Sequence, residues 1–175
     1  LQCVAFALAY GISFNIAGGT HHAFSDRGEG FCMLNDQAIG ANYLLRKKMA
    51  KRVLIIDLDV HQGNGTAEIF INDPRVFNFS MHWSKNYPIR KERSDLDIDL
   101  EDGCKDDAYL ALLMQHLNEV TQGFHPDFIF YQAGVDVLAT DKLGRLGLTK
   151  TGCKRRDQYV IEFAHHEQIP MVVCM

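Results

Sequence analysis

Five short apolar runs, separated by longer segments with helical spacing, constrain the fold of this chain more than any other feature. The clearest run, Val53–Ile56, consists of consecutive aliphatic residues, which is typical of a strand buried on both faces. Strands of this kind that alternate with helices predict a parallel sheet covered by helices on both sides. The expected strands are Ile12–Ile16, Val53–Ile56, Val76–Met81, Phe128–Ala133 and Ile169–Cys174.

The segments between these runs carry helix signals. Good N-cap residues precede several of them, and Pro74 is expected to end a short one because proline disrupts a helix. The expected helices are Asn35 or Asp36 to Lys48, Ala67–Ile71, Asp106 to about Val120, and a helix capped by Thr151 that extends to His166. The predicted fold is therefore α/β, a three-layer α-β-α sandwich with a mainly parallel sheet.

One polar stretch, His82–Gly103, is too long for an ordinary connection and is expected to be a functional loop at the rim of a site. Its basic residues Arg90–Arg93 and the acidic residues Asp95, Asp97 and Asp99 are interpreted as a solvated surface of mixed charge. The basic cluster Lys154–Arg156 receives the same interpretation.

Composition limits the class of protein. The 175 residues suit one domain of ordinary globular composition, with 47% hydrophobic and 23% charged residues. A formal net charge of -4 argues against nucleic acid as a direct partner, and no apolar run approaches the ~20 residues that span a bilayer. Five scattered cysteines without a CxxC pair argue against a disulfide framework. A cytoplasmic location is expected, or a nuclear one in a eukaryote.

Metal-capable residues follow two of the predicted strands. Asp57, Asp59 and His61 occupy alternate positions directly after Val53–Ile56, so an extended backbone projects them to one side. Their charges repel unless a cation neutralises them. Asp136, after a different strand, completes a set of two carboxylates and one imidazole, because ligands bind beyond the carboxyl ends of parallel strands. The set suits one Zn²⁺ per chain with an open position, and also Fe²⁺ or Mn²⁺. The alternative is a solvated loop in which these residues never meet.

A histidine pair, His21 and His22, follows the first predicted strand and Gly18-Gly19. On the same sheet edge as the acids, an imidazole that titrates near neutrality can take a proton from water. The alternative is a pair of ordinary loop histidines. The second pair, His165 and His166, is expected on the surface at a helix end.

Four segments together resemble the zinc-dependent histone deacetylase superfamily, in the order of that family. They cover most of the chain and are Gly18–Ala23, Gly30–Asp36, Asp57–Gly65 and Gln132–Asp136. The segments Ser25–Gly28, His61–Gly65 and Asp141–Gly144 are similar to the class IV branch and its bacterial relatives. The resemblance implies the arginase/deacetylase fold.

The resemblance also implies residue roles. Asp59, His61 and Asp136 match the zinc ligands, and His22 matches the general base that activates the attacking water. His21 matches an electrostatic partner of that base. The remaining catalytic positions are matched by Asp57, which orients His21, and Asn64, which stands behind His22 where some branches have an aspartate.

Substrate and monovalent-cation positions follow from the same resemblance. Gly30, Phe31 and Leu143 match the lining of an acyl-lysine tunnel. An inner potassium site is matched by Asp57, Asp59, His61, Ser80 and Met81. An outer potassium site is expected near Phe70, Asp73, Val76 and Tyr109.

The ends of the chain lead to a further expectation. The sequence starts at Leu1 and stops at Met175, directly after a predicted strand. In the family, a tyrosine in a glycine-rich loop after such a strand shares the charge of the oxyanion. Residues 1–175 are therefore expected to form a partial catalytic domain, truncated at both ends and impaired as an isolated fragment.

The resemblance implies zinc-dependent hydrolysis of an acyl-amide, with an acyl-lysine protein or a small acetylated amine as substrate. A non-catalytic metal-binding or scaffold module of the same fold is the first alternative. A hydrolase of the ureohydrolase type with two manganese ions is the second, and it needs more carboxylates around Asp57–His61 than the sequence provides.

Overall fold

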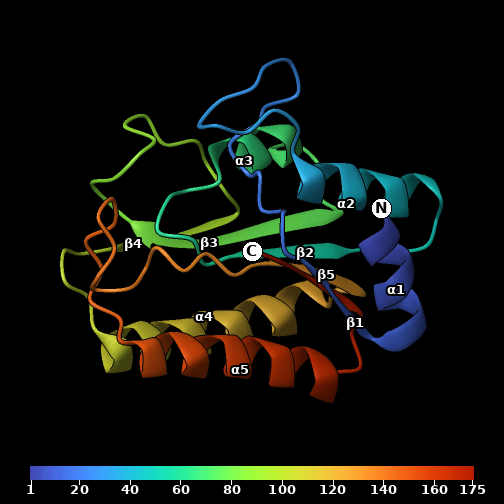
Figure 1. The fold of residues 1–175 in the computed structure, drawn as a ribbon. Coiled ribbons are helices and arrows are strands. Elements are labelled where there is room, and N and C mark those ends of the chain that lie inside the picture. Colours follow the sequence, from blue (N-terminus) through green and yellow to red (C-terminus); the bar gives the residue numbers. More distant parts are fainter.

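Six parallel strands form one sheet in the computed structural model, which describes residues 1–175 (Figure 1). Their order across the sheet is β1-β6-β5-β2-β3-β4, and every neighbouring pair is parallel. The predicted parallel sheet is confirmed. The strands are β1 (Ile12–Asn15), β2 (Val53–Asp57), β3 (Val76–Trp83), β4 (Leu96–Leu100), β5 (Phe128–Gln132) and β6 (Met171–Cys174).

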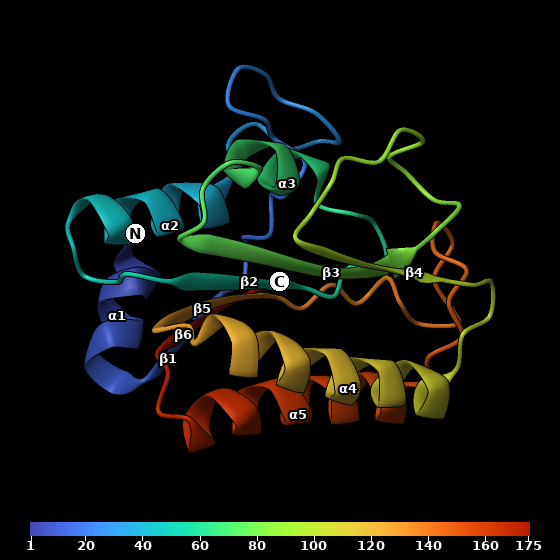
Figure 2. The ribbon, with the colours of Figure 1, turned by 180° about the vertical axis from the view of Figure 1, so that it is seen from behind.

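Helices cover both faces of the sheet, so the expected three-layer α/β sandwich is confirmed. In Figures 1 and 2, α2 and α3 lie on one side of the sheet and α4 and α5 on the other. Helix α1 contributes to the same buried cluster as α2 and α3. The helices are α1 (Gln2–Tyr10), α2 (Asp36–Arg46), α3 (Asn64–Phe70), α4 (Asp106–Phe124) and α5 (Lys150–His166).

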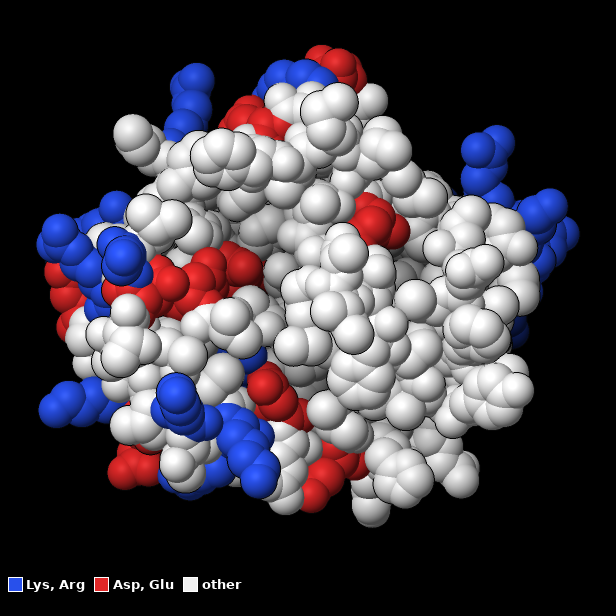
Figure 3. Space-filling view, viewed as in Figure 1, with Lys and Arg blue, Asp and Glu red and all other residues white.

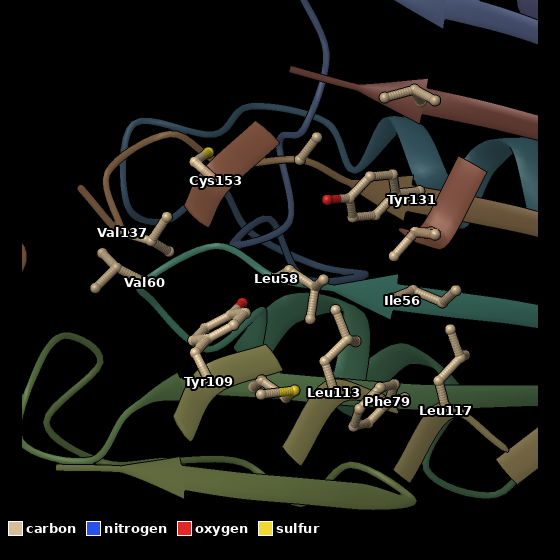
Figure 4. Close-up of a cluster of buried hydrophobic side chains, with 14 of the residues drawn as sticks. Ile56, Leu58, Val60, Phe79, Tyr109, Leu113, Leu117, Tyr131, Val137 and Cys153 are labelled. Carbon is tan, nitrogen blue, oxygen red and sulfur yellow. The ribbon is translucent and has the colours of Figure 1, made fainter. Parts of the chain in front are cut away.

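The larger of two hydrophobic cores lies between the sheet and the α4–α5 layer (Figure 4). Leu113 and Leu117 of α4 face Ile56 of β2 and Phe79 of β3 there, and all four side chains are fully buried. A second core lies under α1, α2 and α3. Because side chains alternate along a strand, the all-apolar run of β2 supplies both cores.

The chain reverses direction across the sheet between β2 and β5. From β2 it continues to β3 and β4 on one side, and then crosses to β5 on the other side of β2. Asp57, the last residue of β2, is in register with Gln132, the last residue of β5. Such a reversal leaves a crevice beyond the carboxyl ends of the two strands, where ligands bind in open α/β sheets.

The segment predicted as one long loop, His82–Gly103, contains a strand. β3 extends to Trp83, and β4 then pairs with it in parallel before the chain enters α4. The signal was present in the alternation of Leu96, Ile98 and Leu100 with aspartates, which is the period of a strand with one covered face. Because the segment is densely negative, it was interpreted as part of a polar loop and not as an edge strand.

Two further expectations are wrong. The N-cap of α5 is Thr149, not Thr151, because the Thr149 hydroxyl accepts a hydrogen bond from the Gly152 amide at 3.0 Å. Arg156 is fully buried, whereas its neighbours Lys154 and Arg155 are exposed as expected. The interpretation as solvated surface is therefore wrong for Arg156, because this residue lies on the face of α5 turned toward the sheet.

His165 and His166 are exposed in the last turn of α5, as predicted.

Charged side chains are unevenly distributed over the face shown in Figure 3. Lysine, arginine and acidic side chains mingle near its left margin, while the area over α1 is largely uncharged. Phe6 and Tyr10 of α1 are among the exposed large hydrophobic residues of the chain. None of the helices combines the length and the apolar character needed to cross a membrane.

Candidate metal centre

Three side chains from two strand ends converge at the carboxyl edge of the sheet. Asp59 and His61 follow β2, Asp136 follows β5, and their donor atoms all lie within 4.8 Å of one another. Nδ1 of His61 lies 2.9 Å from Oδ1 of Asp59 and 3.1 Å from Oδ2 of Asp136. The structure thus brings together the three residues predicted as metal ligands. Two carboxylates and one imidazole suit Zn²⁺, and their ligand types also suit Fe²⁺ or Mn²⁺.

Backbone hydrogen bonds orient these carboxylates. Oδ1 of Asp59 accepts from the His61 amide at 2.9 Å, and Oδ1 of Asp136 accepts from the Val60 amide at 3.0 Å. The second bond joins the loop after β5 to the loop after β2. Gly134 allows a close approach of the two loops, because a Cβ at this position would overlap the Asp59 carboxylate.

In the metal-free protein, the imidazole of His61 contacts the carboxylates of both Asp59 and Asp136. Burial lowers the pKa of His61, but its hydrogen bonds with Asp136 and Asp59 outweigh this and raise the pKa to about 10. Burial also acts to raise the pKa of Asp59, yet the charges of His21 and His61 hold it well below its usual range. Burial raises the pKa of Asp136, and the hydrogen bond with His61 offsets only part of this rise. A divalent cation held by these residues would have to replace a proton on His61, since a ligating imidazole must be neutral.

The predicted histidine pair lies in the loop between β1 and α2, beside the metal-ligand cluster. Nδ1 of His21 is 2.7 Å from Oδ2 of Asp57, and Nδ1 of His22 is 2.7 Å from Oδ1 of Asn64. Both histidines are buried, with ring centroids 4.1 Å apart. The ring of His22 is 5.9 Å from that of His61, centroid to centroid. The four predicted catalytic residues therefore form two adjacent pairs.

Different partners give the two histidines opposite protonation. Burial lowers the pKa of His21, but the carboxylates of Asp57 and Asp59 outweigh it and raise the pKa to about 9. Burial and the positive charge of His21 lower the pKa of His22 to about 4. At neutral pH, His21 is therefore a cation and His22 a neutral imidazole, which is the form that can accept a proton.

Hydrogen bonding also selects the tautomer of His22. The Asn64 amide nitrogen donates to Oε1 of Glu29 at 2.9 Å, so the Asn64 oxygen faces His22. An amide oxygen only accepts, and Nδ1 of His22 must therefore carry the hydrogen. The lone pair of Nε2 is left free as the proton acceptor.

The start of α2 holds the histidine loop in place. The side-chain amide of Asn35, the N-cap, donates to the hydroxyl of Thr66 at 2.9 Å and to the carbonyl of Ala23 at 3.2 Å. The carboxylate of Asp36 accepts from the amide and the hydroxyl of Thr20 at 3.0 and 2.9 Å. The residues recognised in the sequence as candidate helix caps thus also fix the loop that carries His21 and His22.

The predicted substrate-lining residues occupy different settings. Gly30 lies against His22, because a Cβ at this left-handed position (φ +53°) would be 2.6 Å from Cδ2 of the His22 ring. Phe31 and Leu143 are exposed, and Leu143 is tied to the β3–β4 loop through a 3.3 Å bond from the Asn86 side chain to its carbonyl.

Three of the residues expected around an inner potassium ion lie on the neighbouring strands β2 and β3. Ser80 and Met81 of β3 are buried, and Ser80 is in register with Asp57 of β2. The Ser80 hydroxyl is 2.9 Å from Nδ1 of His82.

The outer set of potassium residues does not assemble. Phe70 and Val76 belong to the core under α1, α2 and α3, whereas Tyr109 belongs to the core on the opposite face of the sheet. The expectation of an outer site that includes Tyr109 is therefore wrong. The physical reason is that α4 crosses below the sheet while α3 lies above it (Figure 1).

Sequence reasoning missed Tyr87 and Glu29. The ring of Tyr87 is edge-on to His22 with centroids 4.9 Å apart, and its hydroxyl donates to Oε1 of Glu29 at 2.8 Å. Glu29 thereby joins Tyr87 to Asn64. Tyr87 lies in the stretch interpreted as rim, and no periodicity or spacing indicated that its side chain reaches the histidines.

A second missed pair stands behind the candidate ligand Asp59. The side-chain amide of Gln37 donates to Oε1 of Gln132 at 2.7 Å, and Nε2 of Gln132 is 3.5 Å from Oδ2 of Asp59. Gln37 and Gln132 are buried. Gln37 thus turns the donor end of Gln132 toward the Asp59 carboxylate. The signal available was the position of Gln132 at the end of a buried strand, four residues before Asp136.

Comparison with known proteins places these motifs in a family. A family model described as the histone deacetylase domain matches residues 2–175. An uncharacterized protein of Picosynechococcus sp. is 52% identical over 155 residues, which are 89% of this chain and 52% of that protein. Histone deacetylase 2 of Arabidopsis thaliana is 36% identical over 93% of this chain and 43% of its own length. Histone deacetylase HDAC1 of Drosophila melanogaster is 34% identical over 93% of this chain and 32% of its own length. The chain spans about half or less of the length of these relatives.

Proposed function

The chain belongs to the histone deacetylase family, and on this premise we propose that the complete protein is a metal-dependent hydrolase that removes acyl groups from amines. One observation carries the proposal. The donor atoms of Asp59, His61 and Asp136 converge within 4.8 Å, and a neutral, correctly oriented histidine stands beside them. A ligand set with an adjacent base is the arrangement that amide hydrolysis by an activated water requires.

The metal would be held by Asp59, His61 and Asp136. The chemistry of the donors supports the fit, because Nδ1 of His61 lies 2.9 and 3.1 Å from oxygens of two carboxylates whose negative charges a cation would neutralise. When bound, Zn²⁺ or Fe²⁺ would polarise the amide carbonyl and acidify water. Three protein ligands leave an open position for this chemistry, and Zn²⁺ is the proposed ion.

His22 is proposed as the general base. Its neutral state and its free Nε2 allow it to take the proton of the attacking water and later to return it to the leaving amine. The cationic His21, held by Asp57 at 2.7 Å, would stabilise negative charge that develops on the substrate. Asn64 keeps His22 in the required tautomer without adding a charge.

Acyl-lysine in a protein, or a small acetylated amine, is the proposed substrate class. Gly30, Phe31 and Leu143 are proposed to line its path, and the contact of Gly30 with the His22 ring supports this for the first of them. A potassium ion is proposed at Asp57, Asp59, His61, Ser80 and Met81, in support of the loop after β2. Membership of the class IV-like branch stays a prediction.

The proposal is tested by measuring the metal content of the complete protein and its hydrolysis of acylated amines. The zinc-loaded protein would be assayed against a panel of acyl-lysine peptides and acetylated polyamines. Asp59→Ala and Asp136→Ala should each abolish stoichiometric metal binding and hydrolysis. Asp26→Ala, which removes an exposed carboxylate paired with Arg27, should change neither.

The outcomes separate the alternatives. Unchanged metal content and hydrolysis in Asp59→Ala and Asp136→Ala would contradict the assignment of the site. One bound metal without hydrolysis of any panel member would favour a non-catalytic metal-binding module. Two manganese ions per chain would favour the ureohydrolase type.

A further inference from the structure

The largest fully buried side chain of the molecule is a charged one, Arg156 of α5. Its neighbours Lys154 and Arg155 are exposed, so the helix turns only this guanidinium inward. An arginine is almost never fully buried unless its donors are paired, because its charge cannot be removed by deprotonation. The partners of Arg156 therefore indicate what it does.

One nitrogen of Arg156 joins the two loops that carry the metal-ligand residues. Nη1 donates to the carbonyl of Leu58 at 3.0 Å and to the carbonyl of Gly134 at 2.8 Å. Leu58 directly precedes Asp59, and Gly134 precedes Asp136 by two residues. Neither carbonyl accepts a backbone hydrogen bond. Without the guanidinium, both carbonyls would lack these partners in a buried setting, which costs free energy for each group.

The loops need such a tie because sheet pairing stops just before them. The Leu58 amide still donates to the Gln132 carbonyl at 3.1 Å, but Asp59 and Asp136 lie beyond the paired residues. The bond from the Val60 amide to Asp136 links the loops on the ligand side. Arg156 links them from the side of α5, so its position bears on the separation of the two ligand carboxylates.

The guanidinium is itself held in one orientation. Nε donates to Oδ1 of Asp157 at 2.8 Å, and Nη2 lies 2.7 Å from the same oxygen. The Tyr131 hydroxyl also donates to this oxygen, at 2.6 Å. Because Tyr131 belongs to β5, this shared oxygen fixes the guanidinium relative to the sheet as well as to its own helix. The rigid, planar fork of arginine can serve all these partners at once, and the ammonium of lysine cannot.

We propose that Arg156 is a positioning residue that sets the separation of the Asp59–His61 loop and the Asp136 loop, and thereby the geometry and affinity of the metal site. This role rests on the proposed metal site. It acts through two backbone carbonyls, so Arg156 touches neither metal nor substrate. Groups behind a ligand of this kind typically alter metal affinity by about 10- to 100-fold.

The test compares Arg156→Gln and Arg156→Lys with Arg155→Gln in the complete protein. Arg155→Gln also removes one positive charge from α5, but at an exposed site. Zinc affinity would be measured by competition with a chelator, and ligand geometry by the visible absorption of the Co²⁺-substituted protein. We expect Arg156→Gln to weaken zinc binding by about 10- to 100-fold and to alter the Co²⁺ spectrum. Arg156→Lys should recover part of the affinity, and Arg155→Gln should match the unmodified protein.

Folded Arg156→Gln with the affinity and Co²⁺ spectrum of Arg155→Gln would overturn the proposal. If Arg156→Gln does not fold, Asp157→Asn takes its place, because it keeps the guanidinium but removes the carboxylate that orients it. Asp157→Asn should weaken zinc binding and shift the Co²⁺ spectrum in the same sense, and no change in either would also overturn the proposal. Asp59→Ala distinguishes a failure of the proposed function, since unchanged metal binding in that variant contradicts the metal site itself.

Discussion

At the scale of single residues, the partner of each histidine sets its chemistry. His21 and His22 are adjacent in sequence and both buried, yet their pKa values lie at about 9 and about 4. Burial lowers the pKa of both, but His21 has a carboxylate at 2.7 Å while His22 has a neutral amide at the same distance. A single change of partner should therefore alter the pH range over which the proposed base works.

Asn64→Asp should shift the acidic limb of the pH–rate profile to higher pH. A carboxylate beside Nδ1 stabilises the protonated form of His22 and should raise its pKa from about 4 by about 1–3 units. Because a general base works only when unprotonated, the rate on the acidic side should fall at a higher pH than in the unmodified protein. The measurement is kcat/KM of the metal-loaded protein as a function of pH.

Asn72→Asp, at an exposed position after α3, makes the same change of charge and should leave the profile unchanged. An acidic limb at the same pH in Asn64→Asp and in the unmodified protein would contradict the role of His22 as the base.

At the scale of elements, the two long helices on one face are joined where they begin. Asp106, the first residue of α4, accepts hydrogen bonds from the Thr149 amide at 2.8 Å and from the Thr149 hydroxyl at 2.6 Å. The same hydroxyl accepts from the Gly152 amide and so caps α5. Thr149 thus holds the start of α5 against α4, and α5 in turn carries Arg156 to the loops that bear the proposed metal-ligand residues.

Thr149→Ala should lower the free energy of unfolding by about 1–2 kcal/mol. It removes an N-cap, and it also leaves Asp106 without its hydroxyl partner. Thr151→Ala is the matched control, because Thr151 is exposed and caps nothing. The measurement is urea unfolding followed by circular dichroism. Equal stability of the two variants would contradict the observed cap.

Strand β4 shows why one element was missed. The aspartates in this strand and directly before it suggested a solvated loop, but Asp95 and Asp97 have structural partners. Oδ2 of Asp95 accepts from the Asn78 amide at 2.8 Å, and Oδ1 of Asp97 accepts from the Gln62 side chain at 2.8 Å. These carboxylates tie the edge of the sheet to β3 and to the loop after β2, and only their contacts in three dimensions distinguish this from a mixed-charge surface.

At the scale of the whole molecule, the proposed metal site connects the two halves of the sheet. Its ligand residues come from loops on either side of the reversal between β2 and β5. A bound metal would therefore link segments that the backbone brings together only through a long crossover. Metal binding to the native state alone stabilises that state by mass action.

Zinc should raise the melting temperature of the complete protein, and the rise should diminish as the pH is lowered. A metal at 100 times its Kd adds about 2.7 kcal/mol to the free energy of unfolding. The pKa of His61 is about 10 in the metal-free protein, so binding below this pH releases the His61 proton and weakens as protons become more abundant. Differential scanning calorimetry with and without zinc at pH 6 and pH 8, values chosen on either side of neutrality, measures both effects.

Asp136→Ala should lose the zinc-dependent increase, and Asp26→Ala should keep it. An increase of equal size at both pH values would contradict the displacement of a proton from His61.

The sequence predicted the type of most elements because apolar periodicity reports burial locally. It also located Asp59, His61 and Asp136, since residues just past parallel strands share one edge of the sheet. The extra strand β4, the cap at Thr149 and the burial of Arg156 were not predicted, because each depends on which distant segment covers a residue.

By itself, then, the sequence determined the α/β layering, the edge of the sheet where polar side chains gather and the family resemblance that the comparisons confirm. Only the tertiary structure decided that Glu29 orients Asn64, that Tyr87 stands against His22, and that Arg156 bonds to Leu58 across 98 residues of chain. The reason is physical. A local sequence pattern indicates whether a side chain is buried. The identity of its partner depends on how the crossover connections bring remote loops together.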